Sequence, residues 1–144
     1  MGVANDAAQV LARLRAKLFT PTPATPEAET AALLLYLGLP ATAVLGHVSA
    51  DKGGWVVWTW GPYPSKRALI PSSAATRLRE LAAILKERHA SEGALLRSLQ
   101  YQMQRARERS GGLWWRDVRM IWEAYLGRGT LAKYMRLRQL VLSI

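Results

Sequence analysis

Arginine and tryptophan are the residues of this sequence whose types and clustering suggest a chemical role. Lysine and arginine together number 20 against 10 acidic residues, which gives a net charge of +10 and an isoelectric point near 10.7. Residues 97–144 hold 10 basic and 3 acidic side chains, so this third of the chain carries +7. Clustered positive charge is typical of proteins that bind polyanions. The alternative interpretation is a solvated basic surface without a partner.

Arginine outnumbers lysine 15 to 5. Its planar guanidinium donates paired hydrogen bonds to phosphate, although a GC-rich genome produces the same bias. We expect an anion contact at Arg128, because it precedes a helix N-terminus that already favours negative charge. The candidate nucleic-acid-binding residues are Lys66, Arg67, Arg105, Arg109, Arg116, Arg128, Lys133 and Arg136.

Six tryptophans are too many to be equally buried in a chain of 144 residues. Tryptophan is enriched at the energetic centres of protein interfaces, and together with arginine it stacks the bases of single-stranded nucleic acid. We expect Trp58, Trp114 and Trp122 to lie in the core. The candidate partner-binding residues, expected to be partly exposed, are Trp60, Tyr63 and Trp115.

No pattern in the sequence predicts catalysis or a metal centre. Without cysteine there is neither a thiol nucleophile nor a Cys-ligated zinc site. The chain also lacks a P-loop, a dinucleotide-binding glycine pattern and a zinc-binding helix motif. His47 with Asp51, and His89 with Glu92, are possible pairs, but each lacks the third partner that nucleophilic or metal chemistry requires. We therefore expect a non-enzymatic protein without cofactors.

Apolar spacing and capping residues predict that most of the chain is helical. The longer helices are expected at about residues 6–18, 26–37, 72–89, 91–109, 113–126 and 130–142. A short apolar helix is expected at residues 41–48. The expected N-caps are Asn5 or Asp6, Thr25, Ser72 or Ser73, Ser91 and Thr130, and Gly38 is expected to end the second helix.

Residues 53–70 are the one strongly β-like segment. Residues 55–60 are β-branched or aromatic, which fits a pleated surface, and the prolines within residues 61–65 end that strand. Residues 68–70 offer a return strand. Alternation places Val56, Trp58 and Trp60 on one face of this hairpin, and Trp55, Val57 and Thr59 on the other. The predicted fold is therefore mainly α, of the α+β class, with about six helices around one β-hairpin.

The order of elements over residues 6–90 resembles winged helix-turn-helix DNA-binding domains, with MarR-like regulators as the nearest pattern. Leu37-Gly38-Leu39-Pro40 would be the turn, residues 41–50 the recognition helix, and Ser65-Lys66-Arg67 part of the wing loop. The resemblance implies DNA binding through these elements. The segment 41–48 departs from the pattern, because only Thr42 and His47 offer side chains that reach base edges. A core helix or a partner-binding surface is the alternative there.

We expect a single domain over residues 1–144, with residues 91–144 as a basic, tryptophan-rich C-terminal extension. The expected function is a non-catalytic, nucleic-acid-associated regulator that binds DNA, in preference to RNA, largely through its basic surface. The alternative is a bacterial or phage-encoded protein that modulates the transcription or replication machinery, for example RNA polymerase. Its basic face would then bind an acidic surface of that partner. No secretory signal or membrane span is evident, so we expect a cytoplasmic protein without membrane contact. The sequence leaves the oligomeric state open.

Overall fold

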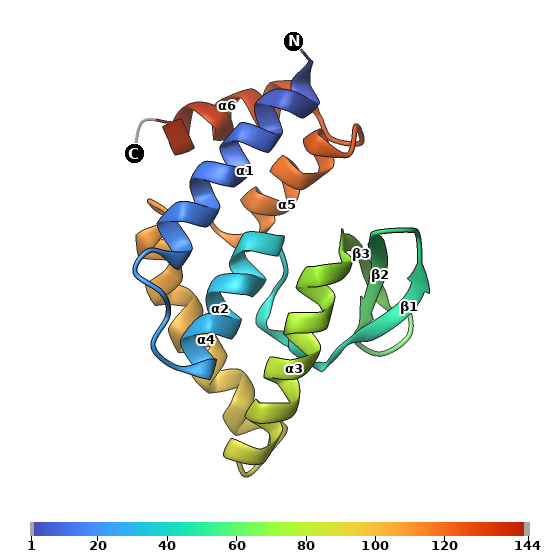
Figure 1. Ribbon diagram of the computed structural model, residues 1–144, viewed down its shortest axis with the longest axis vertical. Helices are drawn as coiled ribbons and strands as arrows, with labels where there is room; N and C mark the ends of the chain where they lie inside the picture. Colours follow the sequence, from blue (N-terminus) through green and yellow to red (C-terminus); the bar gives the residue numbers. More distant parts are fainter. Residues whose placement is uncertain (1, 143–144) are drawn as a thin grey trace.

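Six α-helices and one antiparallel sheet make up residues 2–142, the part of the chain that the computed structural model describes (Figure 1). The fold is mainly helical and of the α+β class, as predicted. The helices are α1 (Val3–Phe19), α2 (Pro26–Leu37), α3 (Ser72–Arg88), α4 (Glu92–Arg109), α5 (Trp115–Tyr125) and α6 (Leu131–Leu142). A short 3-10 helix, η1 (Ala41–Leu45), precedes the strands β1 (His47–Asp51), β2 (Trp55–Trp60) and β3 (Lys66–Pro71).

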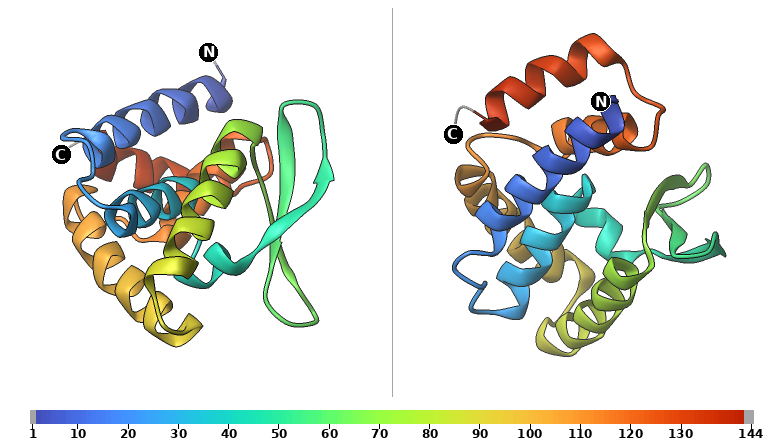
Figure 2. Two further views of the ribbon diagram at one scale, coloured as in Figure 1. Left: turned by 60° about the horizontal axis from the view of Figure 1, so that its bottom comes forward. Right: turned by 45° about the horizontal axis from the view of Figure 1, so that its top comes forward.

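Helix α2 lies at the centre of the helical body. It packs against α1, α3, α4 and α5, and seven residues on all its sides are buried and uncharged: Thr30, Ala31, Ala32, Leu33, Leu34, Leu35 and Leu37. A helix that is apolar all round is a buried helix. Helices α1, α5 and α6 gather at one end, and the sheet lies to one side next to α3 (Figures 1 and 2).

The ends of α2 are formed as the sequence predicts. Thr25 accepts a hydrogen bond from the backbone N–H of Ala28 at 3.0 Å, with Pro26 in the first turn. Gly38 ends the helix with φ +72°, a conformation that favours glycine. A Cβ atom at Gly38 would lie 2.5 Å from the backbone nitrogen of Arg119 in α5. This glycine therefore permits both the helix end and the close approach of α5.

The predicted helix at residues 41–48 is wrong. The 3-10 helix η1 stops at Gly46, and His47 and Val48 pair with Thr59 and Trp58 in the sheet. The indole Nε1 of Trp58 donates to the carbonyl oxygen of Ala43 at 2.7 Å, which fixes η1 against β2. Short apolar runs do not distinguish helix from strand by periodicity. The segment proposed as a recognition helix is thus not α-helical, and the helix–sheet–helix order alone does not identify a winged-helix domain.

The predicted hairpin forms, but as part of a three-stranded sheet in the order β1-β2-β3. Strands β2 and β3 pair from Trp55 with Pro71 to Trp60 with Lys66. One face is buried through Val56, Trp58 and Trp60, as the alternation predicts. The expected exposure of Trp60 is wrong, since it is 7% exposed on this inner face.

Among the other predicted N-caps, that of α4 is confirmed, whereas those of α1 and α3 are wrong. Ser91 caps α4, because its hydroxyl accepts from the N–H of Ala94 at 3.1 Å. Capping of α1 by Asn5 or Asp6 is wrong, since that helix already begins at Val3. Capping of α3 by Ser72 or Ser73 is also wrong, because Pro71 occupies the N-cap position.

Five aromatic rings form a cluster between α1, α2, α5 and β2. Trp122 contacts Tyr36, Trp55 and Tyr125 edge to face, with ring centroids 5.5–6.1 Å apart, and Phe19 contacts Tyr36. The indole Nε1 of Trp122 donates to the carbonyl oxygen of Tyr36 at 2.6 Å. Trp122 is 5% exposed, so its predicted core position is confirmed.

Ion pairs join α2 to α3. Glu27 accepts from Arg88 Nε at 3.0 Å and lies 3.1 Å from the Nε2 of His89, while Glu29 and Arg77 form a bidentate pair. Burial acts against ionisation of Glu27 and is the largest single influence on its pKa. Hydrogen bonds from Arg88, from the backbone and from His89 together outweigh it and lower that pKa.

Candidate nucleic-acid interface

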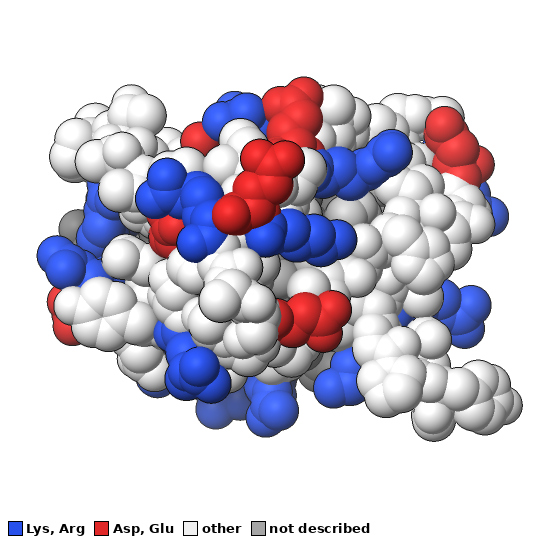
Figure 3. Space-filling model, turned by 90° about the horizontal axis from the view of Figure 1, so that it is seen from below, with Lys and Arg blue, Asp and Glu red and all other residues white. Residues whose placement is uncertain are grey.

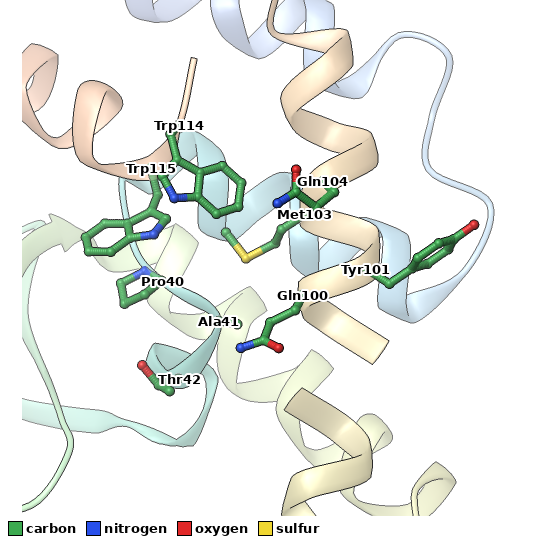
Figure 4. A pocket seen from close by; sticks show the side chains of 9 residues that line it. All are labelled: Pro40, Ala41, Thr42, Gln100, Tyr101, Met103, Gln104, Trp114 and Trp115. Carbon is green, nitrogen blue, oxygen red and sulfur yellow. The ribbon is translucent and has the colours of Figure 1, made fainter. Parts of the chain in front are cut away.

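The structure places Trp115 in the same region as one of the predicted arginines, Arg116, and also as Arg107, which the sequence did not single out. This region contains a pocket of about 470 Å³ between α4, the start of α5 and the turn before η1 (Figure 4). We call it the tryptophan pocket. Its lining residues are Pro40, Ala41, Thr42, Gln100, Tyr101, Met103, Gln104, Trp114 and Trp115.

The loop from α4 to α5 holds the two tryptophans in place. Gly111 and Gly112 turn the chain with φ of +79° and +98°. The Ser110 hydroxyl lies within 3.0 Å of the carbonyl oxygens of Arg107 and Leu113. The Asp117 carboxylate accepts from the backbone N–H of Trp114 at 2.8 Å, which caps the start of α5. Hydrogen bonds therefore fix the backbone of the loop that carries both indoles, and the indoles also pack against the core.

An arginine lies over each of these indoles. The guanidinium carbons of Arg107 and Arg116 lie 5.1 Å from the ring centroids of Trp114 and Trp115, respectively. Arg107 is also held by a 3.1 Å hydrogen bond from its Nε to the carbonyl oxygen of Gly112. A cation–π contact at an exposed site contributes roughly 0.5–1 kcal/mol. Guanidinium cations therefore lie over the two aromatic rings that help to line this pocket.

Both tryptophans of the pocket are partly exposed. This agrees with the expectation for Trp115, whereas the expected core position of Trp114 is wrong in part. Its side chain packs against the core and also lines the pocket. The reason is the glycine turn, which ends α4 before Trp114 and places it outside the regular helix packing.

Polar groups converge on the same pocket from two elements. Gln100 and Gln104 project from α4 and Thr42 from η1, whereas Tyr101 points away (Figure 4). Amide and hydroxyl groups both donate and accept hydrogen bonds, as the edges of nucleobases require. The sequence places both glutamines on the polar outer face of α4, but only the fold shows that Thr42 lies opposite them.

The remaining predicted residues are distributed over several surfaces. Arg105 lies over Tyr101, with its guanidinium carbon 6.0 Å from the ring centroid, and Arg109 donates to the carbonyl oxygen of Pro21 at 2.9 Å. Arg67 and Arg128 both line a second hollow. Lys66, Lys133 and Arg136 are exposed at the start of β3 and on α6, and Tyr63, 96% exposed, stands in the β2–β3 loop.

Positive charge does not cover the surface uniformly. On the face drawn in Figure 3, acidic side chains are interspersed among the basic ones. A net charge of +10 therefore does not by itself identify a binding surface, and the local combination of aromatic rings with cations is the more specific feature.

Neither of the two possible histidine pairs forms. His47 and Asp51 lie at opposite ends of β1, about 13 Å apart at 3.3 Å per residue. His89 contacts Glu27 rather than Glu92. Within residues 2–142, no group of three or more histidine or carboxylate side chains is placed to hold a metal ion.

No protein-family model, curated protein or solved structure matches this chain. None of the helices in the described residues is long and apolar enough to cross a bilayer.

Proposed function

We propose that the protein is a non-catalytic, cytoplasmic regulator that binds single-stranded nucleic acid, with DNA preferred to RNA, at the tryptophan pocket. The observation that carries this proposal is the pairing of Arg107 with Trp114 and of Arg116 with Trp115, because both indoles line a pocket together with glutamine and threonine.

The physical basis is the sum of stacking and charge. A base that stacks on an aromatic side chain contributes about 1–3 kcal/mol, and every base has a flat face that permits such stacking. The neighbouring guanidinium groups attract the phosphates on either side of that base, since arginine binds phosphate in a bidentate manner. Gln100, Gln104 and Thr42 would contact the base edge.

Binding to fluorescently labelled oligonucleotides tests this proposal. We expect dT12 to bind more tightly than a DNA duplex of the same length, because only an unpaired base enters a stacking pocket. The affinity should fall as salt is raised, since phosphate neutralisation releases counterions. An RNA oligonucleotide, rU12, tests the preference for DNA. The proposal fails if none of these ligands binds at low salt, or if the duplex binds at least as tightly as the single strand.

A second candidate function, the binding of a protein partner, is favoured by two neighbouring hollows on the α1 and α3 side that share Arg15, Tyr36 and Pro71. Partly exposed aromatic side chains line them, including Phe19 and Trp55. Aromatic floors of this kind are typical of interface hot spots. A subunit of the transcription machinery with an acidic surface, such as RNA polymerase, is the expected partner. A partner captured from a lysate that persists after nuclease treatment supports this function, whereas one that disappears supports nucleic-acid binding.

A further inference from the structure

A second basic site lies on the outer face of the sheet. Lys52, Arg67 and Arg128 line a hollow of about 380 Å³ together with Val57, Ala68 and Leu69. The three cations come from the β1–β2 turn, from β3 and from the α5–α6 turn, so three separate segments converge. Register places Val57, Arg67 and Leu69 on the face opposite the buried Trp58. We call this the basic hollow.

The cations of the basic hollow are not neutralised by ion pairs. Among residues 2–142, the carboxylates that form salt bridges do so with Arg77, Arg88, His89 and Arg138, and none with Lys52, Arg67 or Arg128. All six lining residues are basic or uncharged. Three exposed cations held around a concave surface repel one another, and an anion bound between them would relieve that repulsion.

Arg119 connects the basic hollow to α5. Its Nη2 donates to the carbonyl oxygen of Leu69, a lining residue, at 3.4 Å, and its Nη1 donates to that of Leu37 at 3.2 Å. Burial lowers the pKa of Arg119 to about 10, and the nearby charge of Arg128 adds to this effect while Glu123 opposes it. Arg119 stays protonated at neutral pH, so a further positive charge lies behind the hollow.

Helix α5 also leads from the basic hollow to the tryptophan pocket. Trp115 and Arg116 form its first turn, Arg119 lies one turn further, and Arg128 follows its C-terminal end. Residues 115–125 span about 15 Å at 1.5 Å per residue. That distance corresponds to four or five stacked nucleotides at 3.4 Å each.

We propose that one single strand follows a path from the tryptophan pocket along α5 to the basic hollow. It stacks a base at Trp115 and places phosphates between Lys52, Arg67 and Arg128. This inference rests on the proposed function and extends it to the length of the ligand. A dinucleotide occupies only the tryptophan pocket, whereas a strand of about six nucleotides or more reaches both sites.

The test compares two charge-removal variants of the full chain. The hollow variant combines Lys52→Ala, Arg67→Ala and Arg128→Ala. The matched control combines Arg13→Ala, Arg79→Ala and Lys86→Ala, which removes three exposed basic side chains elsewhere. Both have the same net charge, and thermal unfolding verifies that both are folded. Binding of dT12 is measured by anisotropy over a salt series, and binding of dT2 by the shifts of the indole N–H signals in NMR spectra.

We expect the hollow variant to bind dT12 at least tenfold more weakly than the control. Its slope of log affinity against log salt should be smaller by about 2, because each phosphate contact on a single strand contributes about 0.7. Binding of dT2 should be equal in both variants. If dT12 binds the hollow variant and the control with the same affinity and slope, the basic hollow is not part of the path, although the tryptophan pocket stands. If neither dT2 nor dT12 binds the unaltered protein, the proposed function and this inference both fail.

Discussion

Two groups of tryptophans flank the same helix, α5, and differ in what surrounds them. Trp55 and Trp122 contact other aromatic rings edge to face, and the Nε1 of Trp122 is satisfied by the carbonyl oxygen of Tyr36. Trp114 and Trp115 instead carry arginines over their rings and open to solvent. In the described part of the chain, no cation lies over the rings of the first group. The same residue type therefore serves as core in one group and as a candidate ligand surface in the other.

The largest effect on stability is expected when the ring at the centre of the buried group is removed. Trp122→Ala should lower the free energy of unfolding by about 3–5 kcal/mol, because a large aromatic side chain leaves a cavity that the surroundings fill only in part. Thermal or urea unfolding measures this loss. A melting temperature equal to that of the parent would show that the comparison is wrong and that Trp122 is not a core residue.

The corresponding change in the exposed group should affect binding more than stability. Trp115→Ala should weaken dT12 binding by about 1–3 kcal/mol, or roughly 5- to 150-fold, because one stacked base loses its platform. Its unfolding free energy should change less than that of Trp122→Ala, since the ring is partly exposed. Arg116→Gln is the companion variant that keeps the ring and removes the cation above it. Unchanged affinity in both variants would place the bound strand elsewhere.

Acid should destabilise the helical body through the ion pair of Glu27 with Arg88. The pKa of Glu27 is lower in the folded protein than its usual value of 4.5, so its contribution to stability is complete above about pH 4.5 and is lost as pH falls through the folded pKa. Unfolding should therefore become easier below pH 4.5, and less so in Glu27→Gln. A stability profile unaltered by Glu27→Gln would contradict the role of this carboxylate.

The smallest effects on stability and affinity are expected from substitutions on α6. Lys133 and Arg136 are exposed and lie in neither the tryptophan pocket nor the basic hollow. The double variant Lys133→Ala, Arg136→Ala should change stability by less than about 0.5 kcal/mol and dT12 affinity only slightly. A loss of affinity as large as that of the hollow variant would move the phosphate contacts to α6 and away from Arg128.

The sequence predicted the regular elements well where local signals agree. The α2 cap at Thr25, the stop at Gly38, the cap at Ser91 and the β2–β3 hairpin all follow from backbone chemistry within a few residues. The segment 41–51 was mispredicted because it is short and apolar. Its strand state depends on pairing with β2 and on the hydrogen bond from the Trp58 indole to Ala43, neither of which is local.

The candidate site was predicted only by residue type. The sequence indicated arginines and Trp115 as candidate binding residues. It predicted the wrong exposure for Trp60 and Trp114, and it did not predict that Arg67 and Arg128 line one hollow. Periodicity reports which side of a strand a residue occupies, not which helix covers that side. The exposure of a tryptophan thus depends on the packing of neighbouring elements.

By itself, the sequence determined the α+β class, the ends of several helices and the excess of positive charge, because helix caps, apolar spacing and net charge are properties of neighbouring residues or of simple sums. The tertiary structure decided that η1 leads into a third strand, that Trp60 is buried and Trp114 partly exposed, and that Lys52, Arg67 and Arg128 share one hollow. These outcomes depend on contacts between residues far apart in the chain. Such contacts are fixed only when α5 packs against Gly38 and the sheet lies beside it, and no local pattern encodes that packing.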